Sequence, residues 1–439
     1  MIAAEPKTAG QYQPYPEYKD SGVEWLGEVP TNWSVATLRH ALVGIKNGST
    51  ATQLDEGIDT VQISRIETIS TGEINHDKVG FVEFVDALHH YRLNVGDILF
   101  SHINSLPMVG NIAQYCSKIP LYHGMNLLRL QPSAKVESRY LYWWLKSTFS
   151  RQSVESLAKP AINQASIAID QIKSIPCLYP MWDEQCIIAA FLDYETARID
   201  RLITQQQRLI ELLKEKRQAV ISHAVTKGLN PEAPMKDSGI EWLGQVPKHW
   251  KVGSLRWYLR VSSGEYLSNQ HFDLEPSESA IYPVIGGNGV MGYTSHKNQA
   301  TPLVVGRVGA LCGNVHLVDG ECWVTDNALL IGLSSKISVN FAAHYLKSLN
   351  LNKLANQNTQ PLITGTMIKD QNIALPPLHE QSEIVEFVTQ EEQKLNLLVA
   401  KAEQAIVLMQ ERRTALIAAA VTGKIDLRGW TTPADEVAV

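Results

Sequence analysis

Features of membrane, secreted and zinc-binding proteins are missing from this sequence. No apolar run approaches the roughly 20 residues that a membrane-spanning helix needs, and the polar, Pro-rich N-terminus does not resemble a signal peptide. The cysteines form no C-x-x-C pair, so we expect buried, reduced thiols at Cys116, Cys177, Cys186, Cys312 and Cys322. We therefore expect a cytoplasmic protein without a membrane partner.

Catalytic and metal-binding motifs are also missing. Neither the G-x-x-x-x-G-K-[ST] loop of nucleotide-driven motors nor the H-E-x-x-H motif of zinc enzymes occurs. The glycine-rich stretch Ile285–Gly289 lacks the Lys-Ser/Thr end and is typical of a turn. His89 and His90 have no Cys or His nearby to complete a site, and the acid-base run Glu211–Lys216 lies inside a helical pattern. We expect no catalytic residue and no metal in this chain.

Length and charge narrow the class further. With 439 residues, of which 44% are hydrophobic and 19% charged, the chain should form two to four folded domains. A nucleic-acid-binding protein usually carries a basic surface, whereas the net charge here is -6. Local patches rather than the total charge set the field at a groove, so DNA binding is not excluded, but unaided binding is not expected to be strong.

The most informative feature is a sequence that occurs twice. PMWDEQCIIAAFL at Pro180–Leu192 returns as PPLHEQSEIVEFV at Pro376–Val388, and EKRQAVISHAVTKG at Glu215–Gly228 returns as ERRTALIAAAVTGK at Glu411–Lys424. Both repeats are 196 positions apart, so no residue has been gained or lost between them. A loop would tolerate such changes, whereas a rigid element would not.

This repeated stretch predicts a long helix. Residues three and four apart form an amphipathic stripe over Ile199–His223 and again over Leu395–Ala419. Prolines precede each copy, Glu184 and Glu380 lie where the helix dipole favours anions, and a Gly follows each copy. From Asp183 to Thr226 the helix would be roughly 65 Å long. An amphipathic helix packed on a core would give the same stripe, but two equal copies favour a coiled-coil pair that acts as a spacer.

A second box is also repeated. YKDSGVEWLGEVPTNWSV at Tyr18–Val35 returns as MKDSGIEWLGQVPKHWKV at Met235–Val252. The S-x-x-E spacing of Ser21 and Glu24 is that of a capping box, so each copy should start a short helical turn. These turns present Trp25, Leu26, Trp242 and Leu243 on one side. The four side chains either pack on their own domain or contact a partner protein.

The spacing of matched residues shrinks steadily along the two copies. It is 217 positions for the boxes and 196 for the helices. Between them it is 205 for His102 and Arg307, 203 for Gly110 and Gly313, and 201 for Leu145 and Leu346. The chain is therefore a tandem duplication of a globular domain plus a long helix, with different loops in each copy.

Each globular part should be mostly β with a few helices, which makes the fold class α+β. Strands are expected at apolar runs bounded by Gly, Asn and Pro, namely Val61–Ile66, Asp97–Phe100, Asn126–Leu130, Pro302–Val305 and Ala328–Ile331, and short helices at Tyr140–Lys146 and Phe341–Leu349. The expected organisation is a disordered leader (1–17), domain 1 (18–177), long helix 1 (178–229), domain 2 (230–373), long helix 2 (374–429) and a tail (430–439).

Four elements in the order box, helix, box, helix resemble the specificity subunits of type I restriction-modification systems. The resemblance rests on DSGxEWLGxVPxxW at Asp20–Trp33 and Asp237–Trp250, on PxxxEQxxI, and on the terminal AVTxG or AVTGK, and it covers the chain from about Tyr18 to Gly429. It implies two target-recognition domains, each reading one half of a split, asymmetric DNA site. It also implies that the two helices pair antiparallel and set the spacing of the half-sites.

The resemblance also implies partners. They are double-stranded DNA, two methyltransferase subunits and restriction/translocase subunits in the cytoplasm of a prokaryote. S-adenosylmethionine, ATP and Mg would belong to those subunits, and no cofactor is expected in this chain. The chain has no NPPY-like methyltransferase motif, since Asn230-Pro231-Glu232 does not match it. Candidate partner contacts are the box residues Trp25, Leu26, Trp242 and Leu243 together with Glu184, Gln185, Glu380 and Gln381 of the helix starts.

Candidate DNA contacts are polar residues in loops that differ between the copies. Arg is the usual bidentate partner of guanine, and Asn or Gln of adenine. In domain 1 they are Lys46, Asn47, Arg65, His102, Asn104, Lys159, Asn163 and Gln164; in domain 2 they are Asn288, Lys297, Arg307, Gln357, Asn358 and Gln360. Each could instead stabilise a turn or contact a phosphate.

Two other classes of protein stay open. A self-contained endonuclease would need catalytic motifs that the sequence lacks, and nicking by the purified chain with magnesium would favour it. A structural adaptor would bind protein through its coiled coil and never DNA, which a DNA-binding assay of the reconstituted complex would distinguish.

Overall fold

The computed structural model describes the chain in five stretches, 12–161, 164–268, 272–298, 303–355 and 361–433. The chain divides into two compact units, called unit 1 (Met1–Gln205 with Ala405–Val439) and unit 2 (Gln206–Gln404). Each unit holds one β-rich domain and one half of each of two long helices. The predicted α+β repeat of domain plus helix is confirmed.

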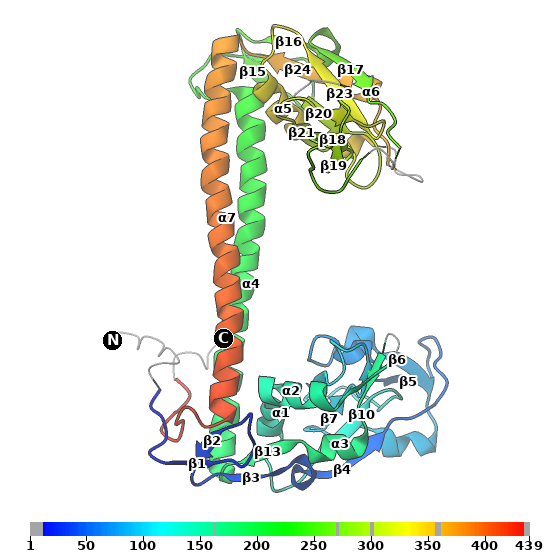
Figure 1. The fold of residues 1–439 in the computed structure, drawn as a ribbon, viewed down its shortest axis with the longest axis vertical. Coiled ribbons are helices and arrows are strands. Elements are labelled where there is room, and N and C mark those ends of the chain that lie inside the picture. The colour runs from blue at the N-terminus through cyan, green and yellow to red at the C-terminus, as the bar shows by residue number, and fades with distance from the viewer. Residues whose placement is uncertain (1–11, 162–163, 269–271, 299–302, 356–360, 434–439) are drawn as a thin grey trace. The chain divides into compact units, whose positions relative to one another are not determined.

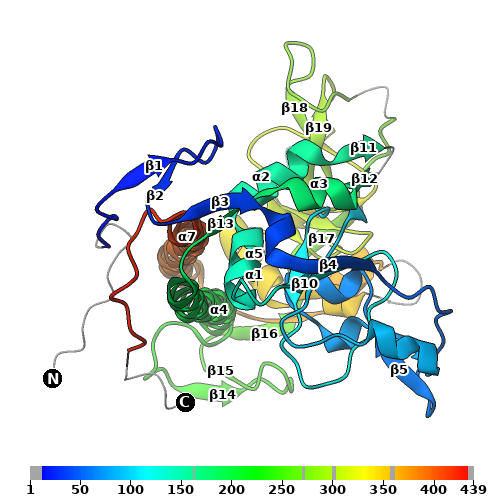
Figure 2. The ribbon, with the colours of Figure 1, turned by 90° about the horizontal axis from the view of Figure 1, so that it is seen from below.

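The two long helices are α4 (Trp182–Lys227) and α7 (Leu378–Val421). They lie side by side in both ribbon views (Figures 1 and 2). Glu184 and Glu380 fall in their first turns, as expected for anions at the positive end of a helix dipole. The predicted bounds of the first helix, Asp183 and Thr226, are each one residue inside the observed ones.

Cross-helix contacts show that α4 and α7 are antiparallel. In unit 1, Nε of Arg413 lies 3.0 Å from Oδ1 of Asp200. In unit 2, Nη1 of Arg217 donates to Oδ1 of Asn396 at 2.9 Å. Arg413 lies 196 positions after Arg217, and Asn396 lies 196 after Asp200. The repeated sequence therefore makes the same contact once in each unit.

The predicted apolar stripe is only partly the buried face. Ile199 and Leu213 are buried as expected, but Leu202 is 41% exposed and Leu398 is 48% exposed. Residues chosen at steps of three and four drift around a straight helix over several turns, and a pair of helices covers only a narrow strip of each. The outer part of the stripe is left uncovered.

The domain of unit 1 contains a four-stranded antiparallel sheet in the order β4-β10-β7-β9. Smaller sheets pair β1 with β2, β3 with β13 and β5 with β6, and place β12 between β11 and β8. The strands are β1 (Tyr18–Asp20), β2 (Glu28–Pro30), β3 (Ser34–Thr37), β4 (Leu42–Asn47), β5 (Thr60–Ile63), β6 (Gly80–Glu83), β7 (Ile98–Phe100), β8 (Ile103–Asn104), β9 (Ile112–Gln114), β10 (Leu128–Pro132), β11 (Lys159–Ala161), β12 (Gln164–Ser166) and β13 (Pro176–Tyr179). The helices are α1 (Ser138–Lys146), α2 (Thr148–Leu157) and α3 (Ile169–Ser174).

The domain of unit 2 repeats this plan with the order β17-β23-β20-β21. It pairs β14 with β15 and β16 with β24, and places β18 between β19 and β22. The strands are β14 (Met235–Asp237), β15 (Gln245–Pro247), β16 (Lys251–Ser254), β17 (Leu259–Ser263), β18 (Tyr282–Gly286), β19 (Gly289–Thr294), β20 (Leu303–Gly306), β21 (Val315–Leu317), β22 (Trp323–Val324), β23 (Ala328–Leu333) and β24 (Asn372–Leu375). The helices are α5 (Val339–Ser348) and α6 (Gly365–Lys369). All five predicted strand runs overlap a strand, and both predicted short helices form.

Each domain shares its hydrophobic core with the long helices. In unit 1, Trp33 and Trp144 of the domain belong to one buried cluster with Phe191 of α4 and Leu416 of α7. In unit 2, Trp250 and Phe341 belong to a cluster with Ile221 of α4 and Ile384 of α7. The buried aromatic residues therefore hold each domain against its part of the helix pair.

The repeated box forms the predicted helical turn inside a hairpin, since the N–H of Gly27 donates to the carbonyl of Val23 at 3.1 Å and that of Gly244 to Ile240 at 2.9 Å. The predicted capping box, however, is wrong. The hydroxyl of Ser21 accepts from the N–H of Val23 at 3.1 Å, two residues on, and not from Glu24 as a capping box requires. Ser238 does the same with Ile240 at 3.1 Å. Competing local bonds of this kind are common for Ser. They leave room for only one turn between β1 and β2 and between β14 and β15.

The structure describes the last six residues of the leader, 12–17, as packed on the rest of unit 1, so the prediction of a disordered leader is wrong for these six. The rest of the leader lies outside the described residues. Tyr15 is buried, with its ring 5.8 Å from that of Trp33, and its hydroxyl donates to Glu184. The ring of Tyr12 lies 5.4 Å from that of Phe191 on α4. These aromatic rings pack against the rest of unit 1, which the polar, Pro-rich composition of the leader did not predict.

The described residues also bear on the expectations about membrane spans, metal sites and cysteines. There, no helix is long and apolar enough to span a membrane, and no cluster of His, Cys, Asp or Glu is arranged to hold a metal. All five cysteines are free, but Cys116 is exposed and Cys186 half-buried, so the prediction of buried thiols is wrong for these two.

Candidate nucleic-acid interface

Two distant segments of unit 1 meet at the small sheet β11-β12-β8. β11 and β12 form a hairpin, and β12 pairs with β8. The N–H of Ile167 donates to the carbonyl of His102 at 3.0 Å, which extends this pairing. The sheet gathers four of the candidate DNA contacts, His102, Asn104, Lys159 and Gln164. Lys159 and Gln164 are exposed.

His102 is half-buried, so only part of its imidazole can meet a ligand. Burial lowers the pKa of the imidazole, and Nδ1 is itself buried with no partner among the described residues, which leaves Nε2 as the ring nitrogen that a base could reach. A neutral imidazole carries one donor and one acceptor, which suits the mixed donors and acceptors of base edges. The amide of Asn104, by contrast, is occupied: Nδ2 donates to Oγ of Ser101 at 3.1 Å, and Oδ1 accepts from the N–H of Ser105 at 2.8 Å. His102 is the better candidate for reading a base.

Lys46, Asn47 and Arg65 are exposed and form a second group. A Cβ on Gly48 would lie 1.9 Å from the carbonyl oxygen of Gly124, so these backbones approach as only glycine permits. Gly124 N–H also donates to Oγ of Ser64 at 3.0 Å. The segments that carry Asn47 and Arg65 therefore converge on Gly124. The Arg65 guanidinium lies 3.4 Å from a Glu67 carboxylate, so its charge is partly neutralised.

Arg307 follows β20 in unit 2. Its Nη1 donates to Oγ of Ser263 at 3.0 Å and to the carbonyl of Asp326 at 3.3 Å, and both of these acceptors are uncharged oxygens. A Cβ on Gly306 would lie 2.2 Å from the carbonyl of Gly287, so the β18–β19 turn that carries Asn288 passes close to Arg307. Arg307 keeps its positive charge and most of its donors for a ligand.

Lys297 lies at the other end of the β18–β19 hairpin from Asn288. Its ammonium is 2.6 Å from a Glu321 carboxylate and lies over the ring of Tyr282 at 5.5 Å. The neighbouring Glu321 raises the pKa of Lys297. The structure therefore separates Lys297 from Asn288 and Arg307 and gives its charge a partner. Asn163, Gln357, Asn358 and Gln360 lie outside the described residues.

His102 and Arg307 occupy the same position in the two domains. The N–H of Ile363 donates to the carbonyl of Arg307 at 2.9 Å, just as Ile167 does to His102 at 3.0 Å. The preceding residues, Ser101 and Gly306, each accept from a glycine N–H of the following loop, at 2.7 and 2.8 Å. The same scaffold site thus carries a neutral imidazole in one domain and a guanidinium in the other.

The helix-start residues are occupied within this chain. Glu184 and Gln185 are buried, Glu184 accepting from Tyr15. Gln381 is buried too, and Glu380 accepts from Trp250 Nε1 at 3.0 Å. The interpretation as a partner surface does not fit the burial of Glu184, Gln185 and Gln381, whereas Glu380 is half-buried.

The box residues divide into two kinds. Leu26 and Leu243 are 3% and 1% exposed and belong to the cores, whereas Trp25 and Trp242 are 39% and 50% exposed. Only the two tryptophans remain available to a partner. Trp25 also stacks on Phe149, with ring centroids 5.9 Å apart.

Arg151 supports the loop that follows Asn104, and the sequence did not predict this role. Arg151 of α2 donates from Nη1 to the carbonyl of Val109 at 2.5 Å and from Nη2 to that of Pro107 at 2.8 Å. It thereby holds the loop that follows Asn104. Its Nε also pairs with Glu155 at 2.7 Å, an i,i+4 spacing that is visible in the sequence. The bonds to backbone carbonyls of a distant segment give no such signal.

Two copies of one β-rich scaffold with different polar residues at equivalent positions define a recognition protein with two modules. The family model of the type I restriction modification DNA specificity domain matches the chain twice, over residues 43–212 and 247–406. The chain therefore belongs to that family, as the repeated motifs predict.

Relatives span nearly the whole chain. It is 30% identical over 424 residues to the proposed type I restriction enzyme MjaX specificity subunit of Methanocaldococcus jannaschii, covering 92% of this chain and 96% of the relative. It is 24% identical over 436 residues to the EcoKI specificity subunit of Escherichia coli, covering 91% and 90%.

Solved structures share the fold. The HsdS subunit from Thermoanaerobacter tengcongensis matches with a TM-score of 0.53 at 15% identity, covering 90% of this chain and 98% of that one. A chain from a structural study of complex assembly and conformational transition of the type I R-M system matches with a TM-score of 0.72 at 14% identity, covering 90% and 99%.

Proposed function

We propose that this chain is the DNA sequence-specificity subunit of a type I restriction-modification complex. Each domain reads one half of a split site, and the site is asymmetric because the domains differ. The observation that carries this proposal is the shared scaffold position filled by His102 in one domain and Arg307 in the other. Arg pairs bidentately with guanine, which His cannot do, so the two half-sites should differ at the base that this position meets.

The long helices act as the spacer. They are continuous over Trp182–Lys227 and Leu378–Val421 and make the same cross-helix contact in each unit. A helix rises about 1.5 Å per residue, so its length sets a fixed distance along DNA. The bases between the half-sites are left unread.

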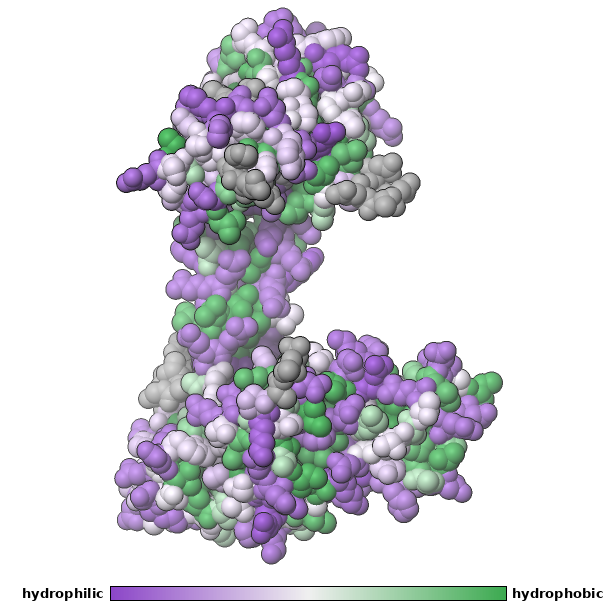
Figure 3. Space-filling model, turned by 45° about the vertical axis from the view of Figure 1, so that its right-hand side comes forward, coloured by the Kyte–Doolittle hydropathy of each residue, from purple (hydrophilic) through white to green (hydrophobic). Residues whose placement is uncertain are grey.

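Two identical partners would fit the repeated exposed residues. Trp25 and Trp242 are exposed in both boxes, and exposed Leu202 and Leu212 of α4 have their copies in exposed Leu398 and Leu408 of α7. Figure 3 shows hydrophobic patches among the polar surface of the helices. Exposed apolar side chains that recur in both copies favour two copies of one protein, namely two methyltransferase subunits.

The chemistry then belongs to the partners. The methyltransferase subunits would use S-adenosylmethionine, and the restriction/translocase subunits would use ATP and Mg. This chain would contribute recognition and geometry and carry out no catalysis. A prokaryotic cytoplasm is the setting that this assembly requires.

Single-molecule methylation mapping tests the proposal. A genome is exposed to this chain together with its neighbouring methyltransferase, and a split, asymmetric adenine-methylated motif that depends on the chain is expected. With the methyltransferase shown to be expressed and active, the absence of any such motif would favour a protein adaptor. Nicking of DNA by the purified chain with magnesium would favour a self-contained endonuclease.

A further inference from the structure

The glutamine that follows each helix-start glutamate makes two equivalent hydrogen bonds in both units, and the one in unit 2 makes a third. Oε1 of Gln185 accepts from the N–H of Glu137 at 2.8 Å, and Nε2 donates to the carbonyl of Pro180 at 2.9 Å. Oε1 of Gln381 accepts from the N–H of Ser338 at 2.8 Å, and Nε2 donates to the carbonyl of Pro376 at 2.9 Å and to that of Lys336 at 2.9 Å. Both side chains are buried, with exposures of 2% and 0%.

These bonds join the long helix to a short helix of the domain. Glu137 is the N-cap of α1, and Ser338 is the N-cap of α5. The far ends of the short helices are also tied: Trp144 donates to the carbonyl of Pro176 at 3.2 Å, and Tyr345 to that of Asn372 at 2.6 Å. Each short helix is thereby fixed to the strand that leads into the long helix.

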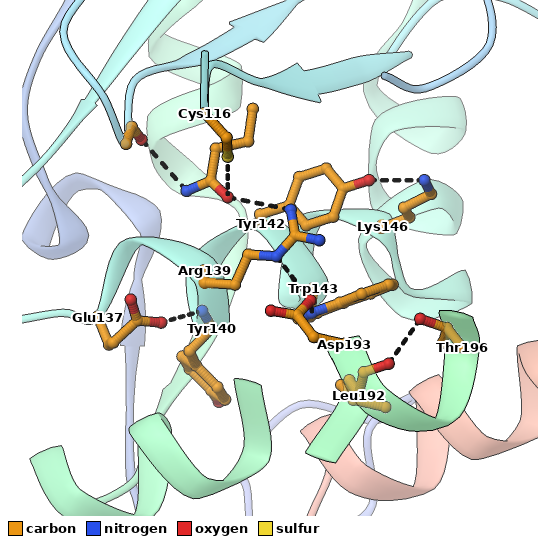
Figure 4. Close-up of polar contacts among 12 residues, drawn as sticks. Cys116, Glu137, Arg139, Tyr140, Tyr142, Trp143, Lys146, Leu192, Asp193 and Thr196 are labelled. Carbon is orange, nitrogen blue, oxygen red and sulfur yellow. Dashed lines mark hydrogen bonds and ion pairs between the residues drawn. The ribbon is translucent and has the colours of Figure 1, made fainter. Parts of the chain in front are cut away.

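In unit 1 a second polar network supports the same junction (Figure 4). Oδ1 of Asp193 on α4 accepts from Nε of Arg139 at 2.7 Å and from Nε1 of Trp143 at 2.9 Å, both on α1. The matching positions of unit 2 hold other residues, Asn340 for Arg139 and Thr389 for Asp193. Both units therefore share the glutamine bonds and the ties at the far ends of the short helices, and of these only the glutamine bonds come from the long helix itself.

We propose that Gln185 and Gln381 are positioning residues that fix the angle between each recognition domain and its long helix, and thereby restrict the number of unread base pairs. The proposal rests on the proposed function. One extra base pair moves the second half-site by about 3.4 Å and turns it by roughly 35° around the duplex. A domain held rigidly by buried hydrogen bonds cannot follow that turn, whereas a loosened junction can.

Substitution by methionine tests this, because methionine nearly matches glutamine in volume but makes none of these bonds. The full complex is assembled with Gln185→Met, with Gln381→Met and with both. Methylation rates are measured on DNA carrying the native spacer and spacers one base pair longer or shorter. Each single variant should lower the preference for the native spacer roughly tenfold, or about 1.4 kcal/mol, which is the net contribution of about two hydrogen bonds. Both half-sites should stay unchanged.

Two control variants separate positioning from general stability. Ile188→Val trims a buried side chain of α4 near Gln185 and should lower stability while keeping the spacer preference. Gln207→Met changes an exposed glutamine of α4 and should change neither. If the Gln185 and Gln381 variants keep the native preference while the wild-type complex methylates a split motif, the positioning role is refuted. Should the wild-type complex methylate no split motif, the proposed function itself is refuted.

Discussion

Single residues at equivalent scaffold positions should determine which bases are read. Arg307→Ala should weaken recognition of one half-site only, by about 1–3 kcal/mol if the guanidinium reads a base. Among the described residues its donors are held by neutral oxygens of Ser263 and Asp326, so no ion pair with these residues is lost. The affinity of the complex for DNA, measured with each half-site varied in turn, shows which half-site is affected. Equal loss on all sequences would make Arg307 a phosphate contact.

Neighbouring residues of the repeated box should separate stability from partner binding. Leu26→Ala removes a buried side chain and should cost about 2–5 kcal/mol in the free energy of unfolding. Trp25→Ala, one residue away, should change stability far less, because the ring is 39% exposed, yet it should weaken binding of the methyltransferase. Denaturant unfolding and pull-down of the partner measure the two effects. The pair Trp242 and Leu243 provides an independent repeat in unit 2.

Buried His123 should make stability depend on pH. Burial lowers the pKa of its imidazole to about 4, and Nε2 lies 3.0 Å from the carbonyl of Leu127. The unfolded state, with a pKa near 6.5, binds the proton more readily, so stability is full above that value and falls as pH drops towards 4. The loss should reach about 3 kcal/mol. His123→Gln keeps a possible donor to Leu127 without this titration, so its unfolding free energy should fall less over the same range.

Residue roles were the least predictable from the sequence. His102 and Arg307 could be paired in advance, because glycines close behind them kept nearly the same spacing. The burial of Gln185 and Gln381 could not be predicted. A Glu-Gln pair at a helix start has the same sequence whether it faces water or packs against a short helix of the domain. Arg151 was missed for a related reason. Its bonds to the backbone carbonyls of a distant loop produce no pattern in the sequence.

The helix pair should accept a matched insertion. Four residues added near Gln206 of α4 and four near Val407 of α7 lengthen each helix by about 6 Å and keep the faces roughly in phase. The contacts Asp200–Arg413 and Arg217–Asn396 should then both survive. Methylation mapping should find the unread spacer longer by about two base pairs with both half-sites unchanged. Altered half-sites would contradict the role of the helices as a spacer.

Elements were predicted well where the sequence repeats itself. Equal spacing over the long helices allowed α4 to be placed within one residue at each end, because an insertion would have shifted its whole face. The helical turn of the box was predicted but its cap was not, because Ser21 accepts from the N–H of Val23 and not from that of Glu24. The leader was missed because its aromatic residues, Tyr12 and Tyr15, are too few to form a periodic pattern.

At the scale of the whole molecule, the net charge should limit the affinity of the chain for DNA when no partner subunit is present. The net charge is -6. Leaving out Lys297, which Glu321 holds, the candidate contacts among the described residues include four cations, namely Lys46, Lys159, Arg307 and Arg65, the last partly neutralised by Glu67. Each phosphate contact lowers log K by about 0.9 per decade of salt, so four give a slope no steeper than about −4. Binding by the chain alone should therefore be weak at physiological salt.

Adding the methyltransferase subunits should steepen that slope, because they would supply the remaining phosphate contacts. Fluorescence anisotropy on one duplex, with salt varied from low to physiological concentration, compares the chain with the assembled complex. Lys159→Ala should make the slope of the complex shallower by about one unit without changing which sequence is preferred. If the chain alone already shows the full slope and affinity of the complex, the recognition domains grip DNA unaided. In that case the chain would carry a larger basic surface than Lys46, Arg65, Lys159 and Arg307 provide, despite its negative net charge.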